Sequence, residues 1–277
     1  MIEFVKMHGL GNDYLYINCI KNREPLFPEE LAKRLSNRHF GVGADGIILV
    51  CNSKIADFKM RIFNSDGSEA EMCGNGIRGF AKYVYDYNLI DKNEFKIETL
   101  AGIRKVKLNT LNKSITENIT VDMGEPILHP VKIPVLTREE PPIKDLKIVI
   151  KNKIFTITCV SMGNPHAIIR LHNLEDINIK EYGPLIENRS EFPKRTNVEF
   201  IEIKDRSRIK IWERGAGETL ACGTGACAST VASVLNGYTE RKVVVELLGG
   251  ELEVEWNEED SHVYMTGPAT TVFRGRI

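Results

Sequence analysis

Two short motifs place a cysteine directly before closely spaced glycines: Cys73-Gly74-Asn75-Gly76 and Cys222-Gly223-Thr224-Gly225. Apolar side chains recur at helical spacing after the first motif, and small apolar residues follow the second, so each motif is predicted to open a helix. The expected helices run from residue 74 to about residue 88 and from residue 223 to residue 235.

A cysteine at the start of a helix is suited to proton transfer. A free thiol has a pKa of about 8.5, and a helix N-terminus stabilises the thiolate by up to about 2 kcal/mol. That free energy corresponds to roughly 1.5 pKa units, so each thiol is expected to titrate at about 7. One such group can act as a base at neutral pH and the other as an acid. Placed on opposite faces of one carbon, they would remove a proton from one side and return one to the other, which inverts the stereocentre.

The backbone around the two cysteines is also suited to binding the negative charge of an amino-acid substrate. The N–H groups of Gly74, Asn75, Gly223 and Thr224 fall in first helical turns, where they lack partners within the helix. They are expected to hold an α-carboxylate and the enediolate-like charge that develops when the α-proton leaves. This chemistry needs no cofactor, and the sequence shows no lysine motif for pyridoxal phosphate.

The two motifs belong to a weak internal repeat. Glu69 and Glu218 each lie four residues before their cysteine, and Asn64 and Glu213 each lie nine before. Further upstream, Gly11-Asn12 and Gly163-Asn164 precede the two cysteines by similar distances. Matching order and nearly matching spacing predict two similar domains.

Other segments indicate mixed strands and helices without regular alternation. Residues 58–63 and 208–211 are predicted to be strands, residues 28–38 a helix, and residues 242–246 and 251–256 a hairpin. Five of the 11 prolines lie between Pro126 and Pro142, which indicates a connection between two halves.

The composition of the 277-residue chain narrows the class of function. It is 42% hydrophobic and 27% charged with a formal net charge of -1, so there is no basic excess for nucleic acid or an anionic membrane. No apolar run is long enough to span a bilayer, and no secretory signal is visible, so a cytoplasmic protein is expected. The six cysteines include no CxxC pair and the histidines show no metal-ligand spacing, so no metal site is expected.

Eight stretches together resemble the diaminopimelate epimerase family, pyridoxal-independent enzymes of lysine and peptidoglycan precursor synthesis. In chain order they are Lys6–Asp13, Arg38–Gly46, Asn64–Glu69, Cys73–Gly76, Gly163–His166, Thr196–Glu199, Trp212–Glu218 and Cys222–Gly225. The resemblance implies conversion of LL-2,6-diaminopimelate to the meso form, with Cys73 and Cys222 as the acid/base pair. It implies that His166 and Glu213 tune the two thiols. The residues implied to bind substrate are Asn12, Asn64, Gly74, Asn75, Asn164, Asn197, Glu213, Arg214, Gly223 and Thr224.

The resemblance also implies the architecture. The expected fold is α+β, with two similar domains that are each a mostly antiparallel curved sheet or barrel around a central helix, and an active site in the cleft between them. The domains are expected at residues 1–124, joined by a returning segment at about 263–277, and at residues 125–262. A homodimer is expected from the family. The other expected partner is a small-molecule amino-acid substrate. Some family members carry Gln where this chain has Gly46, so a contact from that side chain would have to be replaced here.

Several alternatives remain open from the residues themselves. Four of the candidate asparagines could instead serve turns or caps, which asparagine favours: Asn12, Asn64, Asn164 and Asn197. His166 could be a structural histidine, and Glu213-Arg214 could form a surface ion pair that adds little stability. The rival enzyme is a two-cysteine racemase of proline or hydroxyproline, although Asn197 and Glu213-Arg214 favour a substrate with a second charged amino-acid end. A related isomerase without catalytic cysteines, and a metal or redox protein that uses the two thiols, are the other readings.

Overall fold

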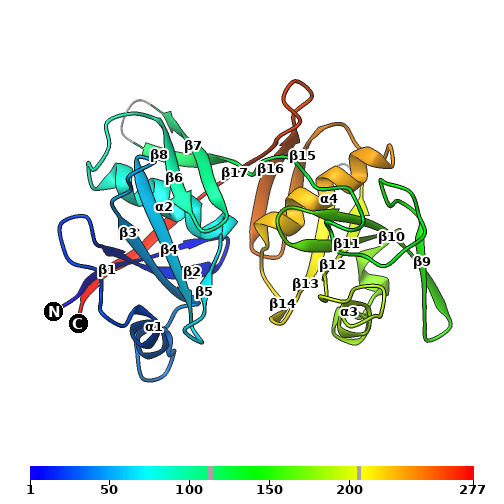
Figure 1. Ribbon diagram of the computed structural model, residues 1–277, viewed down its shortest axis with the longest axis horizontal. Helices are drawn as coiled ribbons and strands as arrows, with labels where there is room; N and C mark the ends of the chain where they lie inside the picture. The colour runs from blue at the N-terminus through cyan, green and yellow to red at the C-terminus, as the bar shows by residue number, and fades with distance from the viewer. Residues whose placement is uncertain (112–114, 205–206) are drawn as a thin grey trace. The chain divides into compact units, whose positions relative to one another are not determined.

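The computed structural model describes residues 1–111, 115–204 and 207–277. The chain forms two compact units, one of Met1–Asp122 with Thr266–Ile277 and the other of Met123–Met265. In its described part, each unit combines a mostly antiparallel set of strands with two α-helices (Figure 1). The predicted α+β class with two similar domains is therefore confirmed.

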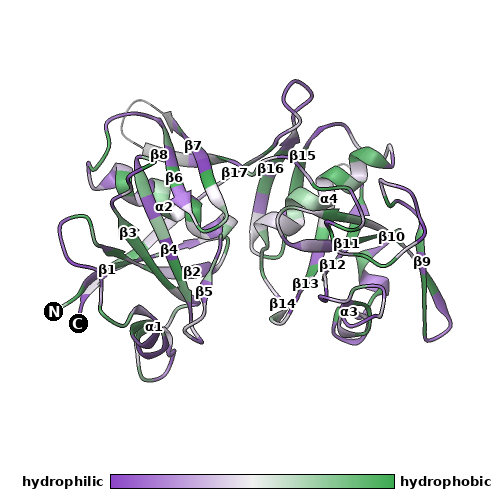
Figure 2. Ribbon diagram, in the orientation of Figure 1, coloured by the Kyte–Doolittle hydropathy of each residue, from purple (hydrophilic) through white to green (hydrophobic). Residues whose placement is uncertain are grey.

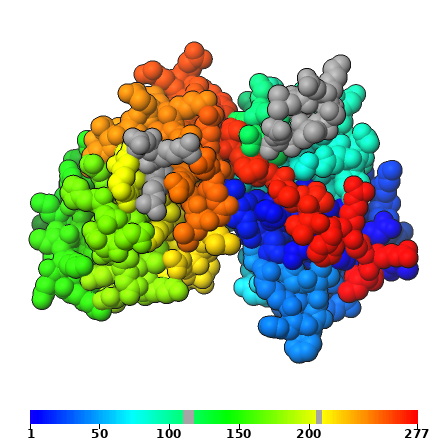
Figure 3. All heavy atoms as spheres, turned by 180° about the vertical axis from the view of Figure 1, so that it is seen from behind, coloured from blue at the N-terminus to red at the C-terminus, as the bar shows by residue number. Residues whose placement is uncertain are grey.

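The first unit is a sheet that wraps around one helix. Its strands are β1 (Glu3–Gly9), β2 (Asn12–Asn18), β3 (Gly46–Cys51), β4 (Phe58–Asn64), β5 (Glu69–Ala70), β6 (Glu94–Thr99), β7 (Gly102–Leu111), β8 (Ile115–Asp122) and β18 (Thr270–Arg276). Its helices are α1 (Pro28–Ser36) and α2 (Gly74–Asp86). The C-terminal strand β18 pairs with β1, so the two chain ends lie side by side, as the red and blue segments of Figure 3 show.

The second unit repeats this order of elements. Its strands are β9 (Leu146–Ile150), β10 (Lys153–Ser161), β11 (Pro165–Leu171), β12 (Asn197–Ile203), β13 (Ser207–Glu213), β14 (Gly217–Glu218), β15 (Lys242–Leu247) and β16 (Gly250–Trp256), with β17 (Val263–Gly267) leading out of the unit. Its helices are the 3-10 turn η1 (Leu174–Asp176), α3 (Ile179–Glu187) and α4 (Gly223–Leu235).

The strand pairings show that the repeat is structural. In the first unit β2–β3 and β4–β6 are parallel, whereas β1–β2, β3–β4, β4–β5 and β6–β7 are antiparallel. In the second unit β11–β12 and β13–β15 are parallel, and the corresponding β10–β11, β12–β13, β13–β14 and β15–β16 are antiparallel. Strands β1 to β7 therefore have counterparts in β10 to β16, and α2 matches α4.

The core of the first unit lies on both faces of β3, between this strand and the helices α1 and α2. Every residue of β3 is buried, and Figure 2 shows this strand as hydrophobic along most of its length. Ile47 and Leu49 pack with Leu31 and Leu35 of α1 in one cluster, while Ile48 points to the first turn of α2. Parallel strands buried on both faces give such unbroken apolar runs. In the second unit, β12 packs Val198 and Phe200 in the cluster that also includes α3.

The predicted helix starts are confirmed, and two predicted helix ends are corrected. Residues Ile77, Phe80, Ala81 and Val84 form the buried face of α2 as their spacing predicted. Helix α2 ends at Asp86 rather than near Asn88, because Asn88 adopts a positive φ of 53° that no helix continues. Helix α1 ends at Ser36 rather than near Arg38, because the Asn37 side chain accepts the N–H groups of His39 and Phe40 and starts a turn. Within the described ranges, no helix has the length and apolarity that crossing a membrane would require.

Candidate active site

Cys73 is the N-cap of α2, and its sulfur lies in a short hydrogen-bonded chain. The Gly76 N–H donates to Sγ at 3.3 Å, and the thiol donates to Asn12 Oδ1 at 3.3 Å. The Asn12 amide in turn donates to Asp45 Oδ2 at 2.7 Å. Asn12 is thus held against the thiol by the carboxylate of Asp45, and Cys73 remains partly accessible.

A cluster of ion pairs fixes the residues behind Asn12. Asp13 contacts Lys6 Nζ at 2.8 Å and Arg38 at 2.7 Å, and the same Arg38 nitrogen contacts Asp45 at 2.9 Å. Burial raises the pKa of Asp13, but the hydrogen bonds from Arg38 and Lys6 outweigh it and leave the pKa below its usual value. The carboxylate is therefore ionised at neutral pH, and the pairs anchor the start of β2.

Tyr14 is a residue of this half-site that the sequence did not single out. Burial raises the pKa of its hydroxyl well above the usual value, and the neighbouring Cys73 raises it further through charge and a hydrogen bond. The Tyr14 hydroxyl also hydrogen-bonds Asn12. Its position within the apolar run of β2 gave no sign of a site role, whereas the structure places its hydroxyl at the thiol.

The other candidate residues of the first unit differ in what their side chains do. Asn64 ends β4 and donates to Ser68 Oγ at 3.0 Å. Asn75 is buried in the first turn of α2, where its amide oxygen accepts from the fully buried Arg78 at 3.0 Å. Gly46 faces Asn64 across β3 and β4, and a Cβ there would lie 2.2 Å from the Phe63 carbonyl oxygen. A Gln at this position would therefore have no room here without movement of the backbone.

Cys222 is the N-cap of α4, and its surroundings are more buried than those of Cys73. Its sulfur lies 3.4 Å from Thr224 Oγ1, and the Gly225 N–H and the Glu213 carboxyl are its other polar neighbours. Burial raises the pKa of Cys222 well above its usual value, and the charge of Glu213 raises it further, against the smaller effects of the Thr224 hydroxyl and the Gly225 N–H. The expected pKa of about 7 is wrong for this thiol, because loss of solvation outweighs the helix N-terminus.

Glu213 ends β13 and shares the environment of Cys222. Burial raises the pKa of its carboxyl, although the neighbouring Cys222 thiol and Thr219 hydroxyl act in the opposite direction. Glu213 and Asn64 end matching strands in the two units, as the repeat predicted.

His166 and Asn164 extend the second half-site away from the thiol. His166 Nε2 lies 3.0 Å from Asn164 Oδ1, and the Asn164 amide donates to Thr224 Oγ1 at 3.2 Å. On the other side of the ring, Nδ1 lies 2.7 Å from Glu199 Oε1, and both side chains are fully buried. Glu199 lies inside the motif Thr196–Glu199, and its contact with His166 could not be recognised from that motif.

Asn197 and Arg214 are tied to the backbone in this structure. Asn197 donates to the Pro165 carbonyl at 2.9 Å and accepts from the Arg214 N–H at 2.8 Å, so its amide joins β11 to the end of β13. The Arg214 guanidinium donates to the Lys194 carbonyl at 3.0 Å. Gly223 begins α4 beside Thr224, as Gly74 begins α2.

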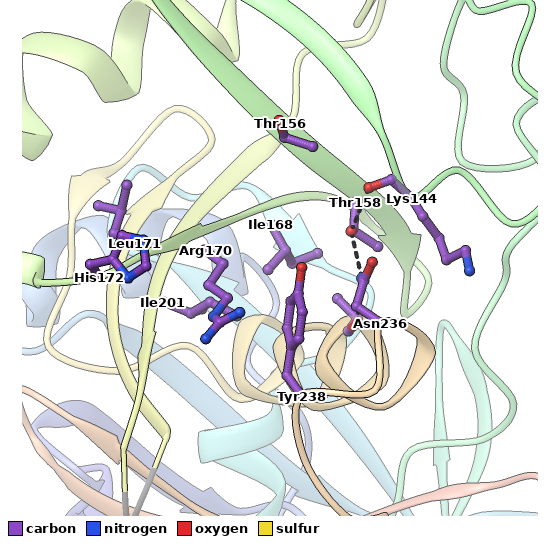
Figure 4. Close-up of a pocket in the computed structure, with 11 residues that line it drawn as sticks. Lys144, Thr156, Thr158, Ile168, Arg170, Leu171, His172, Ile201, Asn236 and Tyr238 are labelled. Atoms are coloured by element: carbon purple, nitrogen blue, oxygen red, sulfur yellow. Dashed lines mark hydrogen bonds between the residues drawn. The ribbon is translucent and has the colours of Figure 1, made fainter.

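A separate cavity of about 290 Å³ in the second unit contains none of the predicted site residues. Figure 4 shows Arg170 against the Tyr238 ring, at 4.2 Å from guanidinium carbon to ring centroid, and the Asn236 amide bonded to Thr158. It holds no cysteine or carboxylate, so it lacks the groups for the predicted chemistry. Across residues 1–111, 115–204 and 207–277, no three His, Cys, Asp or Glu side chains are grouped so that they could hold a metal ion.

The chain is thus a protein of two repeated α+β units, and each unit carries a cysteine as the N-cap of the matching helix. The family model for diaminopimelate epimerase matches residues 4–129 and 158–272. A diaminopimelate epimerase of Methanococcus maripaludis strain C5 is 56% identical over 100% of this chain and 99% of its own, and one of Acetivibrio thermocellus is 54% identical over 100% and 98%. The chain belongs to the diaminopimelate epimerase family.

Solved structures of more distant proteins share the fold. A probable proline racemase from Agrobacterium radiobacter K84 matches 100% of this chain and 93% of its own, with a TM-score of 0.73 at 15% identity. A hydroxyproline epimerase from Agrobacterium vitis matches 99% and 91%, with a TM-score of 0.70 at 14% identity. At such identities the likeness shows the architecture alone.

Proposed function

We propose that this protein converts LL-2,6-diaminopimelate to meso-diaminopimelate by proton transfer between two thiols and the α-carbon, in lysine and peptidoglycan precursor synthesis. One observation carries the proposal: in a member of this family, Cys73 and Cys222 cap matching helices of two repeated units. Both are free thiols, so both are available for acid–base chemistry.

The environments of the two thiols suggest how the reaction starts. The raised pKa of Cys222, caused by burial and then by Glu213, keeps its proton on in the resting enzyme. Once Cys73 has lost the proton that its thiol donates to Asn12 Oδ1, the thiolate would take the α-proton of the bound substrate. The Cys222 thiol would then give its proton to the opposite face of the carbanion, which leaves Cys222 as thiolate and Cys73 as thiol. The mechanism requires both sulfurs to reach one α-carbon, and in the reverse direction the roles exchange.

The remaining candidates would bind the substrate. The backbone N–H groups of Gly74, Asn75, Gly223 and Thr224 lie in the first turns of α2 and α4 and suit the reacting carboxylate. Asn12, Asn64, Asn164, Asn197, Glu213 and Arg214 supply amide, carboxylate and guanidinium groups for an ammonium and a carboxylate at the distal end. His166 and Glu213 would tune the thiols. No cofactor enters this scheme. We further propose a homodimer, as the family resemblance implies, and a location in the cytoplasm.

The direct test is an epimerase assay on the purified protein with LL-diaminopimelate, proline and hydroxyproline. We expect turnover of diaminopimelate alone, and losses of at least about 100-fold in kcat for Cys73→Ala and Cys222→Ala. Cys227→Ala is the matched control, because Cys227 lies one turn further along α4 and is buried in the core. Activity on an imino acid alone would contradict the assigned substrate, and full activity in either variant would contradict the two-thiol mechanism.

A further inference from the structure

The two half-sites differ most at one position beneath the cysteine-bearing helices. Parallel pairing aligns Tyr16 with Ile48 in the first unit and Ile168 with Glu199 in the second, so Ile48 and Glu199 are counterparts. A Cβ on Gly76 would lie 2.8 Å from the Ile48 side chain, and one on Gly225 would lie 2.9 Å from Glu199 Oε1. Where the first unit has a methyl group under its helix, the second has a carboxyl.

Glu199 has one hydrogen-bond partner among the described residues. Its Oε1 lies 2.7 Å from His166 Nδ1, while its Oε2 makes no hydrogen bond within the part of the chain that the structure describes. Both side chains are completely buried. Burial of a carboxyl costs free energy unless the group is paired, and among the described residues Glu199 is paired with His166.

The contacts of His166 determine where its hydrogens are. Nε2 faces Asn164 Oδ1, which only accepts, so Nε2 carries a hydrogen. One further proton lies between Nδ1 and Glu199 Oε1, whichever of the two atoms holds it. The pair is therefore neutral as a whole, and the carboxyl fixes the ring with its Nε2–H toward Asn164.

From His166 the hydrogen bonds lead to the reactive sulfur. His166 Nε2 donates to Asn164 at 3.0 Å, Asn164 Nδ2 donates to Thr224 Oγ1 at 3.2 Å, and Thr224 Oγ1 lies 3.4 Å from Cys222 Sγ. With Asn164 held in this orientation, Thr224 receives a hydrogen from the amide and is free to donate its own to the sulfur. All of these residues lie in the second unit.

We propose that Glu199 is a positioning residue of the site: it holds His166 with a hydrogen on Nε2 and so orients Asn164 and Thr224 toward Cys222. Glu199 touches neither the sulfur nor, in this account, the substrate. The inference rests on the proposed function for its effect on catalysis, but the hydrogen-bond chain itself can be measured without substrate.

The test uses two variants and a matched control. Glu199→Ile places the counterpart residue of the first unit under Gly225 and removes the partner of Nδ1. Glu199→Gln keeps a partner, because its amide can donate to Nδ1 while Nε2 retains its hydrogen. Glu202→Gln is the control, since Glu202 is a buried carboxyl on the same strand that accepts the Leu174 N–H at 2.9 Å.

We expect kcat to fall about 10- to 100-fold in Glu199→Ile, the range seen when a residue that orients another is lost. Glu199→Gln should stay within about threefold of wild type, since one neutral hydrogen bond replaces another. Thermal unfolding and circular dichroism establish that each variant is folded. Equal kcat in folded Glu199→Ile and Glu202→Gln would overturn the proposal, as would equal losses in the Ile and Gln variants, which would make the carboxyl charge decisive.

Two substrate-free readouts separate this proposal from the proposed function. Nitrogen NMR of histidine-labelled protein should show a hydrogen on His166 Nε2 in wild type and Glu199→Gln. Alkylation by iodoacetamide, followed by peptide mapping, should slow severalfold at Cys222 in Glu199→Ile, because the Thr224 hydroxyl lowers the pKa of Cys222 by more than the charge of Glu199 raises it. Alkylation should stay unchanged at Cys73, which serves as internal control. These results would support the chain even if diaminopimelate proved not to be the substrate. An unprotonated Nε2 in wild type, or unchanged Cys222 alkylation in Glu199→Ile, would overturn it.

Discussion

Tyr14 and His166 occupy the same position in the two repeated units. Tyr14 pairs with the first residue of β3, and His166 pairs with the first residue of β12. The Tyr14 hydroxyl reaches Cys73 directly, whereas the His166 ring is linked to Cys222 through Asn164 and Thr224. The duplicated fold thus presents its two thiols with different partners, which suits a reaction in which one thiol gives a proton and the other takes one.

Tyr14→Phe should lower kcat by about tenfold, because one hydrogen bond to the sulfur of Cys73 is worth about 1–2 kcal/mol. Steady-state kinetics with diaminopimelate would measure the change. Tyr87→Phe, at the C-terminal end of α2, is the control and should leave kcat unaltered. Equal rates for Tyr14→Phe and wild type would show that the hydroxyl does not serve the thiol.

Glu213→Gln should shift the titration of Cys222 to lower pH. Burial raises the pKa of Cys222 most, and the carboxylate of Glu213 raises it next, so removal of that charge lowers the pKa while burial still holds it up. Because Cys222 acts as the acid in its protonated form, the alkaline limb of the kcat profile should move to lower pH as well. The rate of alkylation at Cys222 against pH gives the midpoint directly.

Glu218→Gln is the control for this experiment. Glu218 lies four residues before the cysteine and forms an ion pair with Lys180 at 3.6 Å. An alkylation midpoint that moves upward in Glu213→Gln, or equally in both variants, would contradict the assigned effect of Glu213.

The sequence predicted the parts of the site that depend on local structure. Cysteine followed by glycines and an apolar helical pattern identified the starts of α2 and α4, because caps and helical periodicity are local properties. Glu199 and Tyr14 could not be recognised in the same way. Glu199 lies between the apolar residues Val198 and Phe200, and Tyr14 lies in the apolar run of β2. Only the pairing register of the strands brings these two side chains beneath the helices.

The pKa expected for Cys222 is wrong because it, too, depends on tertiary structure. A helix N-terminus can be recognised from sequence, but the burial of the thiol and the approach of Glu213 arise from tertiary packing. Two equivalent helix starts therefore do not imply two equivalent thiols.

Asp13→Asn should destabilise the protein at neutral pH and much less in acid. Burial raises the pKa of Asp13, but Arg38 and Lys6 hold the pKa below its unfolded value, so the carboxylate contributes stability above about pH 4. That contribution is lost as pH falls through the lower pKa of the folded state. Urea unfolding between pH 7 and pH 3 should show a difference of roughly 1–3 kcal/mol that shrinks toward pH 3.

Glu30→Gln, which removes an exposed pair with Lys33, should show little change at any pH in the same experiment. A difference between Asp13→Asn and wild type that stays constant with pH would mean that the ionised form of Asp13 is not what stabilises the fold.

Gly46→Ala should destabilise the first unit. Its Cβ would lie 2.2 Å from the Phe63 carbonyl oxygen, a backbone atom that no change of rotamer can move. Overpacking of this kind costs about 1–3 kcal/mol, so the midpoint of thermal unfolding should fall by several degrees. Gly102→Ala is a useful comparison, since a Cβ there meets no atom within 4 Å and any cost comes from its φ of 97° alone. An unchanged midpoint for Gly46→Ala would show that β3 and β4 can separate at this point.

The central claim is that inversion occurs by proton transfer through Cys73 and Cys222. Its most direct test is turnover of LL-diaminopimelate in heavy water, followed by mass spectrometry and NMR of the meso product. We predict one deuterium at the inverted α-carbon with wild-type protein, and no inversion with Cys73→Ala or Cys222→Ala. Meso product that retains the original α-hydrogen would contradict the account.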